Sequence, residues 1–527
     1  MTTALVLLLL CAPPEAPIDT LVVCPAEFRQ ALEPWLVHRR AAGHGIAVIS
    51  NLKSADALRD EVRETAKAGS LHYLVLVGDA DPAMATNQTL RARCVPTHYV
   101  PAKVNVQYGS EPEIATDNWY ADLDDDRVPE LAVGRLPCDS AADLSHLVQR
   151  IVDYETSRDF GPWRRQVHFV AGLGGFGAMA DAVLEAAAKS LIGDGIPSAY
   201  ATTMTYGSWQ SPYCPDPRQF QQVTIERFNE GSLFWVYMGH GELRAVDRVR
   251  TPGETFPILS TNETNQLACQ HAAPIACFLA CYAGGFDARR DCLAEEMLRA
   301  SGGPVAVLCG TRVTMPYAMS VMGSELLRAC FVEHAETLGD AMLSAKRRMI
   351  HSDDPTRLRQ SLDRAARALS PNAAQLEAER AEHVDLFNLL GDPLLRLPQA
   401  LPVAVDVAST AAPGDEISIS IDSPLAGDGT VELVARRDRL TFHPPRRRSF
   451  EGTSSADYMD TYRRANEPRW VTTQMKVERG ATVARLAVPA EARGPCHVRV
   501  FVSGDDNCAV GAADLRIDPA TTTAARP

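Results

Sequence analysis

Short apolar runs alternate with longer amphipathic stretches between residues 18 and 395. The stretches between the runs, such as CLAEEMLRA, carry apolar residues at the three- and four-residue spacing that is typical of helices. Continuous apolar runs are typical of parallel strands buried on both faces. The pattern therefore predicts an α/β unit with a largely parallel sheet and helices on both of its faces. The runs are TLVVC (20–24), YLVLVGD (73–79), VHFVAG (167–172), LFWVYMG (233–239), IACFLAC (275–281) and PVAVLCG (304–310).

Most of these runs end in glycine followed or preceded by a polar or reactive residue. Ligands of parallel α/β sheets collect at the carboxyl ends of the strands. We therefore expect the functional site at one edge of the sheet, where the runs end.

The pattern changes after GDPLLRLPQALP. Residues 401–520 show period-two alternation in segments such as EISISI and HVRVFVS, separated by the turn sequences PGDE and AGDG. This pattern predicts a C-terminal all-β sandwich of immunoglobulin-like size, with no helix in it. The polar insertion at about 443–470 is expected to be a mobile loop.

A chain of 527 residues is too long for one core. We divide it into an N-terminal α/β subdomain (18–160), a second α/β subdomain (161–398) and the β-sandwich (401–520). The apolar run at the start of residues 1–17 has the length of a signal-peptide core, although no Lys or Arg precedes it. The alternatives are a misassigned start or a first strand. A secreted or periplasmic protein with no integral membrane segment in the mature chain is the prediction.

Charge and cysteine content argue against nucleic-acid binding, a zinc site and a dense disulfide framework. The formal net charge of -14 argues against binding a nucleic-acid backbone. The 13 cysteines include no CxxC pair, so neither a zinc site nor a dense disulfide framework is indicated. Cys496 and Cys508 are the pair that we favour for a disulfide.

Two strand ends carry residues that could act together. FLACYAGGFD places Cys281 at the end of an apolar run, directly before a flexible turn, and FWVYMGHGE places His240 between two glycines after another run. If both runs lie in one parallel sheet, a thiol nucleophile and an imidazole acid/base flank one bound carbonyl, as acyl transfer requires. Cys277 and Cys309 lie inside their runs and are expected to be inert core residues.

These two loops resemble those of the gingipain family of cysteine peptidases, which have a caspase-like fold. YMGHG resembles the family's histidine loop, and LACYAGGFD with the following CLAEEMLRA resembles its nucleophile loop and helix. Further similar segments, in the family's order, are YLVLVGD, NWYADLDDDRVPELAVGRLP, GGPVAVLCGTR and FNLLGDPLLRL.

The resemblance implies a cysteine endopeptidase that hydrolyses peptide bonds of proteins or peptides through a thioester, without a required cofactor. Cys281 would be the nucleophile and His240 the acid/base, and the N–H groups of Gly241 and Cys281 would form the oxyanion hole. Asp181 would receive a basic P1 side chain, with an exposed first-turn aspartate as the alternative reading. The loop TRVTMPYAM would supply a further pocket wall, through Tyr317 or Met315. GLGGFG stands where the family has an acidic residue, which leaves the orientation of His240 unexplained.

Three other interpretations stay open. GLGGFG (172–177) has the GxGxxG spacing of a dinucleotide site, with Asp194 in range of a ribose, although glycines for close strand-to-helix packing explain it better. Asp122, Asp124 and Asp126 have the alternate spacing of a calcium loop, and the resemblance also implies structural calcium. Finally, the chain could be a catalytically silent secreted scaffold with the same fold.

Overall fold

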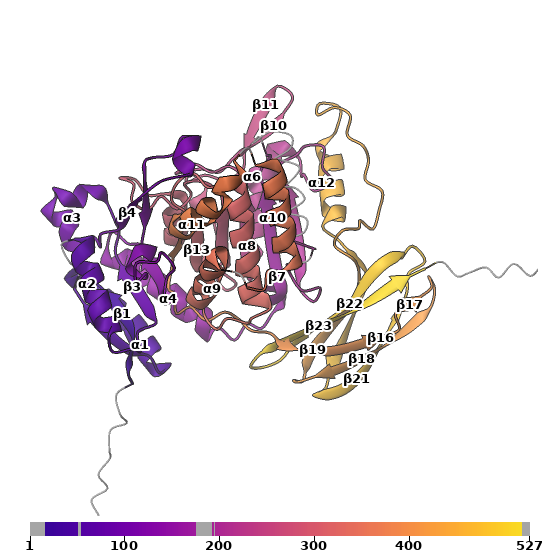
Figure 1. Ribbon diagram of the computed structural model, residues 1–527. Helices are drawn as coiled ribbons and strands as arrows, with labels where there is room; N and C mark the ends of the chain where they lie inside the picture. Colours follow the sequence, from indigo (N-terminus) through magenta and orange to yellow (C-terminus); the bar gives the residue numbers. More distant parts are fainter. Residues whose placement is uncertain are drawn as a thin grey trace, which may run out of the picture.

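The computed structural model describes residues 16–50, 54–174, 192–193, 195–351, 353–370 and 372–518. It shows an α/β unit followed by a β unit that lies beside it (Figure 1). No helix in these described ranges has both the length and the apolar character needed to span a bilayer. The predicted signal segment lies almost entirely outside the described residues.

The α/β unit is built on one ten-stranded sheet. Every apolar run identified in the sequence contributes a strand to it, which confirms the α/β fold class. In spatial order the strands are β2 (Gly45–Ile49), β1 (Ile18–Val23), β3 (Tyr73–Val77), β6 (Ala132–Leu136), β14 (Phe387–Leu390), β13 (Ala306–Gly310), β12 (Ile275–Leu279), β9 (Phe234–Met238), β7 (Gln166–Ala171) and β8 (Ala201–Tyr206).

The sheet consists of two parallel halves that run in opposite directions. β14 is antiparallel to β13 but parallel to β6, so the direction reverses between β14 and β13. We call β2, β1, β3, β6 and β14 the first half, and β13, β12, β9, β7 and β8 the second half. The expectation that all runs end at one edge is therefore wrong. TLVVC and YLVLVGD point their carboxyl ends the opposite way from the strands of the second half.

Helices cover both faces of the sheet, as expected. On β12, Ile275, Cys277 and Leu279 pack into one buried core, whereas Ala276 and Phe278 pack into another on the opposite face. Residues of a strand alternate between faces, so an apolar run without alternation requires two cores. The helices are α1 (Arg29–Ala41), α2 (Ala55–Ala66), α3 (Gln88–Arg93), α4 (Ala141–Thr156), α6 (Phe220–Asn229), α7 (Leu293–Arg299), α8 (Pro316–Phe331), α9 (Leu338–Ile350), α10 (Arg357–Leu369) and α11 (Leu376–Leu386).

Two short antiparallel pairs lie outside the main sheet, and the β unit is a sandwich of two further sheets. The alternation in EISISIDS is reproduced in its burial, with every second residue facing the shared core. The outer pairs are β4 (His98–Pro101) with β5 (Glu113–Thr116), and β10 (Arg248–Thr251) with β11 (Glu254–Pro257). The sandwich strands are β15 (Leu401–Pro402), β16 (Ala404–Val407), β17 (Thr410–Ala411), β18 (Glu416–Ser423), β19 (Gly427–Ala435), β20 (Arg469–Val477), β21 (Gly480–Ala487), β22 (Gly494–Ser503) and β23 (Cys508–Ile517).

The insertion between β19 and β20 is not the helix-free loop that we expected. It contains α12 (Ser455–Ala465), which lies beside the α/β unit in Figure 1. The Asn466 side chain accepts the Met204 N–H at 2.7 Å and donates to the Met204 carbonyl at 3.0 Å. It thus occupies backbone groups of β8, the edge strand of the second half, where an open edge would invite pairing. The cap that begins α12, Ser454 accepting the Asp457 N–H, was readable in the sequence.

The favoured disulfide between Cys496 and Cys508 is also wrong. The two residues lie on neighbouring antiparallel strands, but Cys496 is opposite Leu515 and Cys508 is opposite Ser503. A displacement of seven residues along a strand is about 23 Å, well beyond the roughly 7 Å limit between the Cα atoms of a disulfide. Both thiols are buried and free.

Candidate active site

His240 and Cys281 leave the second half of the sheet at neighbouring positions. β9 and β12 are adjacent and parallel, and the last residues paired between them are Met238 and Leu279. His240 and Cys281 each lie two residues beyond that pair. The Gly239 N–H continues the ladder by donating to the Leu279 carbonyl at 3.2 Å. The two side chains therefore rise from the same rim of the sheet.

Glycines allow the histidine loop to cross close to the cysteine. A Cβ atom on Gly241 would lie 2.3 Å from the Cys281 carbonyl oxygen, so no larger residue fits there. Gly239 has a φ of +149°, a conformation that side chains rarely adopt. These two positions explain why glycine stands on both sides of His240.

Two hydrogen bonds to the His240 carbonyl fix the backbone of the histidine loop. The His240 carbonyl accepts the Tyr237 O–H at 2.8 Å and the Asp247 N–H at 3.1 Å. Tyr237 is fully buried in β9, and burial raises the pKa of its phenol, which keeps it protonated as a donor. Tyr237, a residue of β9, therefore fixes where the backbone of His240 lies relative to the sheet.

Cys281 is the one partly exposed thiol among the described cysteines; the others are buried. Its Sγ accepts the Thr314 N–H at 3.3 Å and lies 3.6 Å from the Thr314 hydroxyl oxygen. By contrast, burial raises the pKa of Cys277 to about 12, so that thiol stays protonated and inert. Partial exposure distinguishes Cys281 from the other described thiols.

The turn after Cys281 is strained and closely packed. Tyr282 has a φ of +55°, which is unusual for a bulky residue and is maintained by the surrounding structure. Its N–H donates to the Arg312 carbonyl at 3.2 Å, and its carbonyl accepts the Gly285 N–H at 3.0 Å. A Cβ atom on Gly284 would lie 2.2 Å from Cys309 Sγ, so the first glycine of the pair is needed for packing. The turn bends the chain sharply away from Cys281.

A cavity of about 500 Å³ adjoins the two loops and is lined by Gly241 and Tyr282 among others. Its polar lining is mainly acidic, with Glu111, Glu242 and Asp287. Asp287 is neutralised by a two-point ion pair with Arg312, at 2.8 and 2.6 Å. Tyr282 donates to Glu111 at 2.9 Å. Sequence reasoning missed Glu111, because it lies in a loop without a motif and reaches the site only in the fold.

With this geometry established, comparison with known proteins identifies the family. The family model that matches residues 13–398 is that of peptidase family C25. The chain belongs to peptidase family C25. The resemblance of the histidine and cysteine loops to gingipains is thereby confirmed.

Similar proteins include Gingipain R2 of Porphyromonas gingivalis, which is 24% identical over 330 residues, covering 59% of this chain and 39% of that protein. Gingipain R1 of the same species is 25% identical over 297 residues, covering 54% of this chain and 26% of that protein. The match thus spans less than half the length of these relatives. The solved structure of the Arg-specific cysteine proteinase gingipain R covers 96% of this chain and 99% of its own, with a TM-score of 0.53 and 16% identity. That likeness shows a shared fold.

Membership of family C25 does not favour the dinucleotide interpretation of GLGGFG. Only its first residues are described, and a Cβ atom on Gly172 would lie 3.0 Å from the Tyr237 hydroxyl oxygen and 3.1 Å from a carboxylate oxygen of Asp247. Gly172 therefore permits close packing beneath the histidine loop. Asp181 and Asp194 lie outside the described residues.

Tyr317 and Met315 lie at the start of α8, in the loop predicted to line the substrate pocket. The Tyr317 hydroxyl donates to Asp363 at 2.7 Å and accepts from Arg380 at 2.8 Å, so it faces α10 and α11. Tyr317 does not line the cavity beside Tyr282. A substrate contact by Tyr317 stays a prediction.

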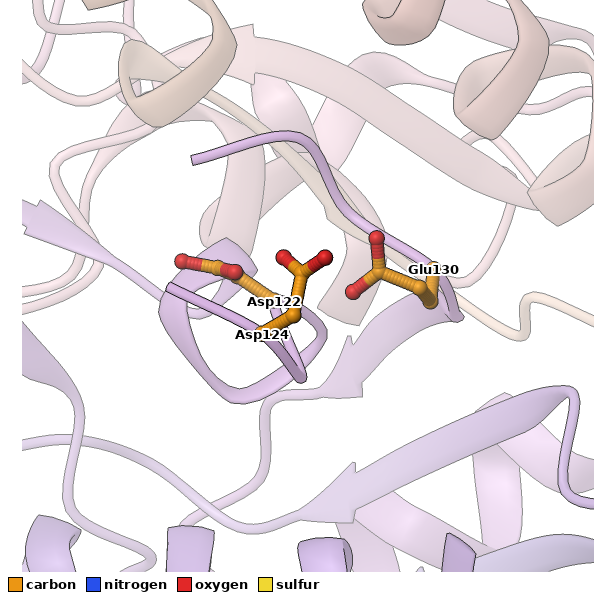
Figure 2. A group of neighbouring side chains, drawn as sticks. All are labelled: Asp122, Asp124 and Glu130. Atoms are coloured by element: carbon orange, nitrogen blue, oxygen red, sulfur yellow. The ribbon is translucent and has the colours of Figure 1, made fainter. Parts of the chain in front are cut away.

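The acidic loop before β6 brings three carboxylates together, but not the three that the spacing indicated. Ligand atoms of Asp122, Asp124 and Glu130 lie within 4.8 Å of one another, and Asp126 is not in this group (Figure 2). Figure 2 shows the Glu130 carboxylate turned toward the two aspartates. Burial raises the pKa of Asp122 and, together with the neighbouring carboxylates, that of Glu130. Carboxylate oxygens in this arrangement suit a calcium ion.

Proposed function

We propose that this chain is a cysteine endopeptidase in which Cys281 is the nucleophile and His240 the acid/base. The observation that carries the proposal is the position of both residues at one rim of adjacent parallel strands, in a member of family C25. The Cys281 proton passes to the imidazole, and Sγ bonds to the scissile carbonyl carbon. The C–N bond then breaks as the imidazolium protonates the leaving amine, which leaves a thioester. Water, deprotonated by His240, hydrolyses the thioester and restores the thiol.

The oxyanion of the tetrahedral intermediates would be bound by the N–H groups of Gly241 and Cys281. Within the described ranges neither group donates to another residue, so both are available to a substrate oxygen. Their closeness, with Gly241 packed on the Cys281 carbonyl, supports a shared role. Fixed donors of this kind stabilise charge that develops only in the transition state.

Proteins or peptides would be the substrates, and a basic P1 residue is the specificity that we propose. Its support is that the solved gingipain R is named an Arg-specific cysteine proteinase and that Asp181 is the acid nearest to the glycine stretch GLGGFG, after which the resemblance implies a carboxylate for such a side chain. Secretion or a periplasmic location follows from the apolar N-terminal segment and stays a prediction.

Cleavage of a mixed peptide library by the purified chain tests activity and P1 preference together. Cys281→Ala and His240→Ala should each lower kcat/KM by at least about 10³-fold. The controls are Cys24→Ala, which removes a buried thiol, and His271→Ala, which removes an exposed imidazole. Asp181→Asn should weaken cleavage after Arg and Lys selectively. No cleavage of any peptide by the wild-type chain would favour the silent scaffold.

We also propose that calcium binds Asp122, Asp124 and Glu130 and stabilises the loop. Chelation should lower the melting temperature by a few degrees, and calcium should restore it, because a ligand at about 100 times its Kd adds roughly 2.7 kcal/mol. Asp124→Asn should abolish the response. Asp126→Asn is the matched control, since Asp126 accepts the Val128 N–H and lies outside the group. Indifference to chelator, or equal loss in both variants, would contradict the proposal.

A further inference from the structure

The thiol of Cys281 lies against the turn that leads into α8. Thr314, whose N–H donates to Sγ at 3.3 Å, is separated from the first residue of the sixteen-residue helix by Met315 alone. The N-terminus of a helix carries a partial positive charge, and an N–H donor adds to it. A thiolate at Sγ accepts the Thr314 N–H two residues before α8, whereas the thiol form donates to the Thr314 carbonyl oxygen 3.7 Å away.

α11 holds that turn from the other side through His383. The Met315 N–H donates to His383 Nε2 at 2.7 Å, so Nε2 is the unprotonated nitrogen of the ring. His383 Nδ1 lies 2.7 Å from the Glu379 carbonyl oxygen and must therefore carry the proton. The side chain is fully buried, and burial lowers its pKa to about 4, which keeps the ring neutral with a fixed tautomer.

Two further contacts hold the same turn and the first turn of α8. The Asn105 side chain donates to the Val313 carbonyl at 3.2 Å. The Ala318 N–H donates to the Glu379 carboxylate at 3.1 Å. His383 binds the N–H that follows that of Thr314 along the chain, and the Thr314 hydroxyl itself donates to Met319 Sδ at 2.8 Å.

We propose that His383 is a positioning residue for the nucleophile. By fixing the Met315 N–H, it directs the Thr314 N–H and the N-terminus of α8 at Sγ of Cys281 and stabilises the thiolate over the thiol. The proton leaves Sγ for His240, as in the proposed function on which this inference rests. His383 itself touches neither substrate nor the reacting atoms.

The phenols of Tyr237 and Tyr282 interact electrostatically with Cys281, and burial raises the pKa of Tyr282 to about 12 and that of Tyr237 further. Both phenols are neutral below pH 10. Glu379, which accepts the Ala318 N–H in the first turn of α8, does titrate in this range, because burial raises its pKa to about 7, and it is left unchanged in every variant compared below.

The test measures how fast iodoacetamide alkylates Cys281 between pH 5 and 10, by mass spectrometry of the peptide that contains it. His383→Leu removes the acceptor for the Met315 N–H. It should move the midpoint of the profile up by about one pH unit, which lowers the rate at pH 6 about tenfold and leaves the plateau at high pH within twofold. His383→Gln, whose amide oxygen can accept the same N–H, should recover most of the shift. Ser320→Ala is the control, because the Ser320 hydroxyl donates to the Pro316 carbonyl within α8, and it should leave the midpoint unchanged.

An unchanged midpoint in folded His383→Leu, equal shifts in the Leu and Gln variants, or a full shift in Ser320→Ala would overturn the proposal. Should His383→Leu not fold, Asn105→Ala loosens the same turn through the Val313 carbonyl. This variant should raise the midpoint by a smaller amount, and an unchanged midpoint would overturn the proposal. Alkylation needs no peptide substrate. A wild-type chain that cleaves no peptide yet shows these shifts would therefore contradict the peptidase assignment and not the role of His383.

Discussion

The two halves of the ten-stranded sheet carry similar sequence patterns at their strand ends, but the thiol is buried in one half and partly exposed in the other. Each half has a strand that is followed directly or closely by a cysteine, Cys24 after β1 and Cys281 after β12. Each also has a strand that ends in a glycine of positive φ, Gly78 after β3 and Gly239 after β9. In the first half the thiol is fully buried, and burial raises its pKa to about 11. In the second half the thiol is partly exposed, with an N–H donor at Sγ.

The difference lies in what covers the strand ends. In the first half Arg135 crosses the end of β3, donates to the Gly78 carbonyl at 2.9 Å and forms a fully buried ion pair with Asp117. In the second half a cavity lies next to Gly241 and Tyr282, in the loops that follow β9 and β12. A strand-end motif thus becomes a candidate site only where the neighbouring segments leave its end open.

The largest expected contrast is in thiol reactivity. At pH 7, iodoacetamide should alkylate Cys281 at least about 10³-fold faster than Cys24, because a thiol with a pKa near 11 is ionised in roughly one molecule in 10⁴ at that pH and is also shielded. Peptide mapping after timed alkylation measures both sites in one sample. Cys24→Ala should in turn lower the free energy of unfolding by about 1–2 kcal/mol through the cavity it leaves, while Cys281→Ala should barely change it. Comparable alkylation rates would remove the distinction between the halves.

The buried ion pair of the first half offers the next largest effect. Arg135→Met leaves the Asp117 carboxylate buried without its partner, which should cost about 3–5 kcal/mol of unfolding free energy. The shift of the urea midpoint measures this cost. Arg516→Met is the control, since its partner Asp518 and the arginine itself are largely exposed, and such pairs contribute about 0–1 kcal/mol. Equal shifts in the two variants would show that Arg135 does not close the first half in the way the contacts indicate.

The smallest effect concerns Glu379, a buried residue of α11 that binds the first turn of α8. Burial raises the pKa of its carboxyl group from 4.5 to about 7 in the folded chain. The folded state therefore binds the proton more tightly, so this group contributes stability that is complete below pH 4.5 and is lost as pH rises through 7. Glu379→Gln should flatten the fall in unfolding free energy over this range by on the order of 1–3 kcal/mol. Thermal melts from pH 4.5 to 8 measure it, with the exposed Glu377→Gln as control. A parallel pH profile in wild type and Glu379→Gln would contradict the shifted pKa.

Much of the second half could be predicted because its signals are local. Continuous apolar runs identified β9, β12 and β13, and the glycines around His240 and after Cys281 marked chain segments that pass close to others. The helix in the 443–470 insertion was missed although Ser454 and Asp457 form a helix cap, since polar composition was taken as evidence for a loop. The Cys496 and Cys508 pairing failed because closeness in sequence does not fix the register of a hairpin.

The sequence by itself determined the α/β and β units, the strands, and which two residues could act as thiol and imidazole, because these depend on apolar periodicity and on residue type. Only the tertiary structure decided that the two halves of the sheet run in opposite directions, that Arg135 closes one set of strand ends, and that His383 reaches the turn beside Cys281. These features join residues far apart in the chain. Their geometry is set by how strands pair and helices pack, which no local pattern specifies.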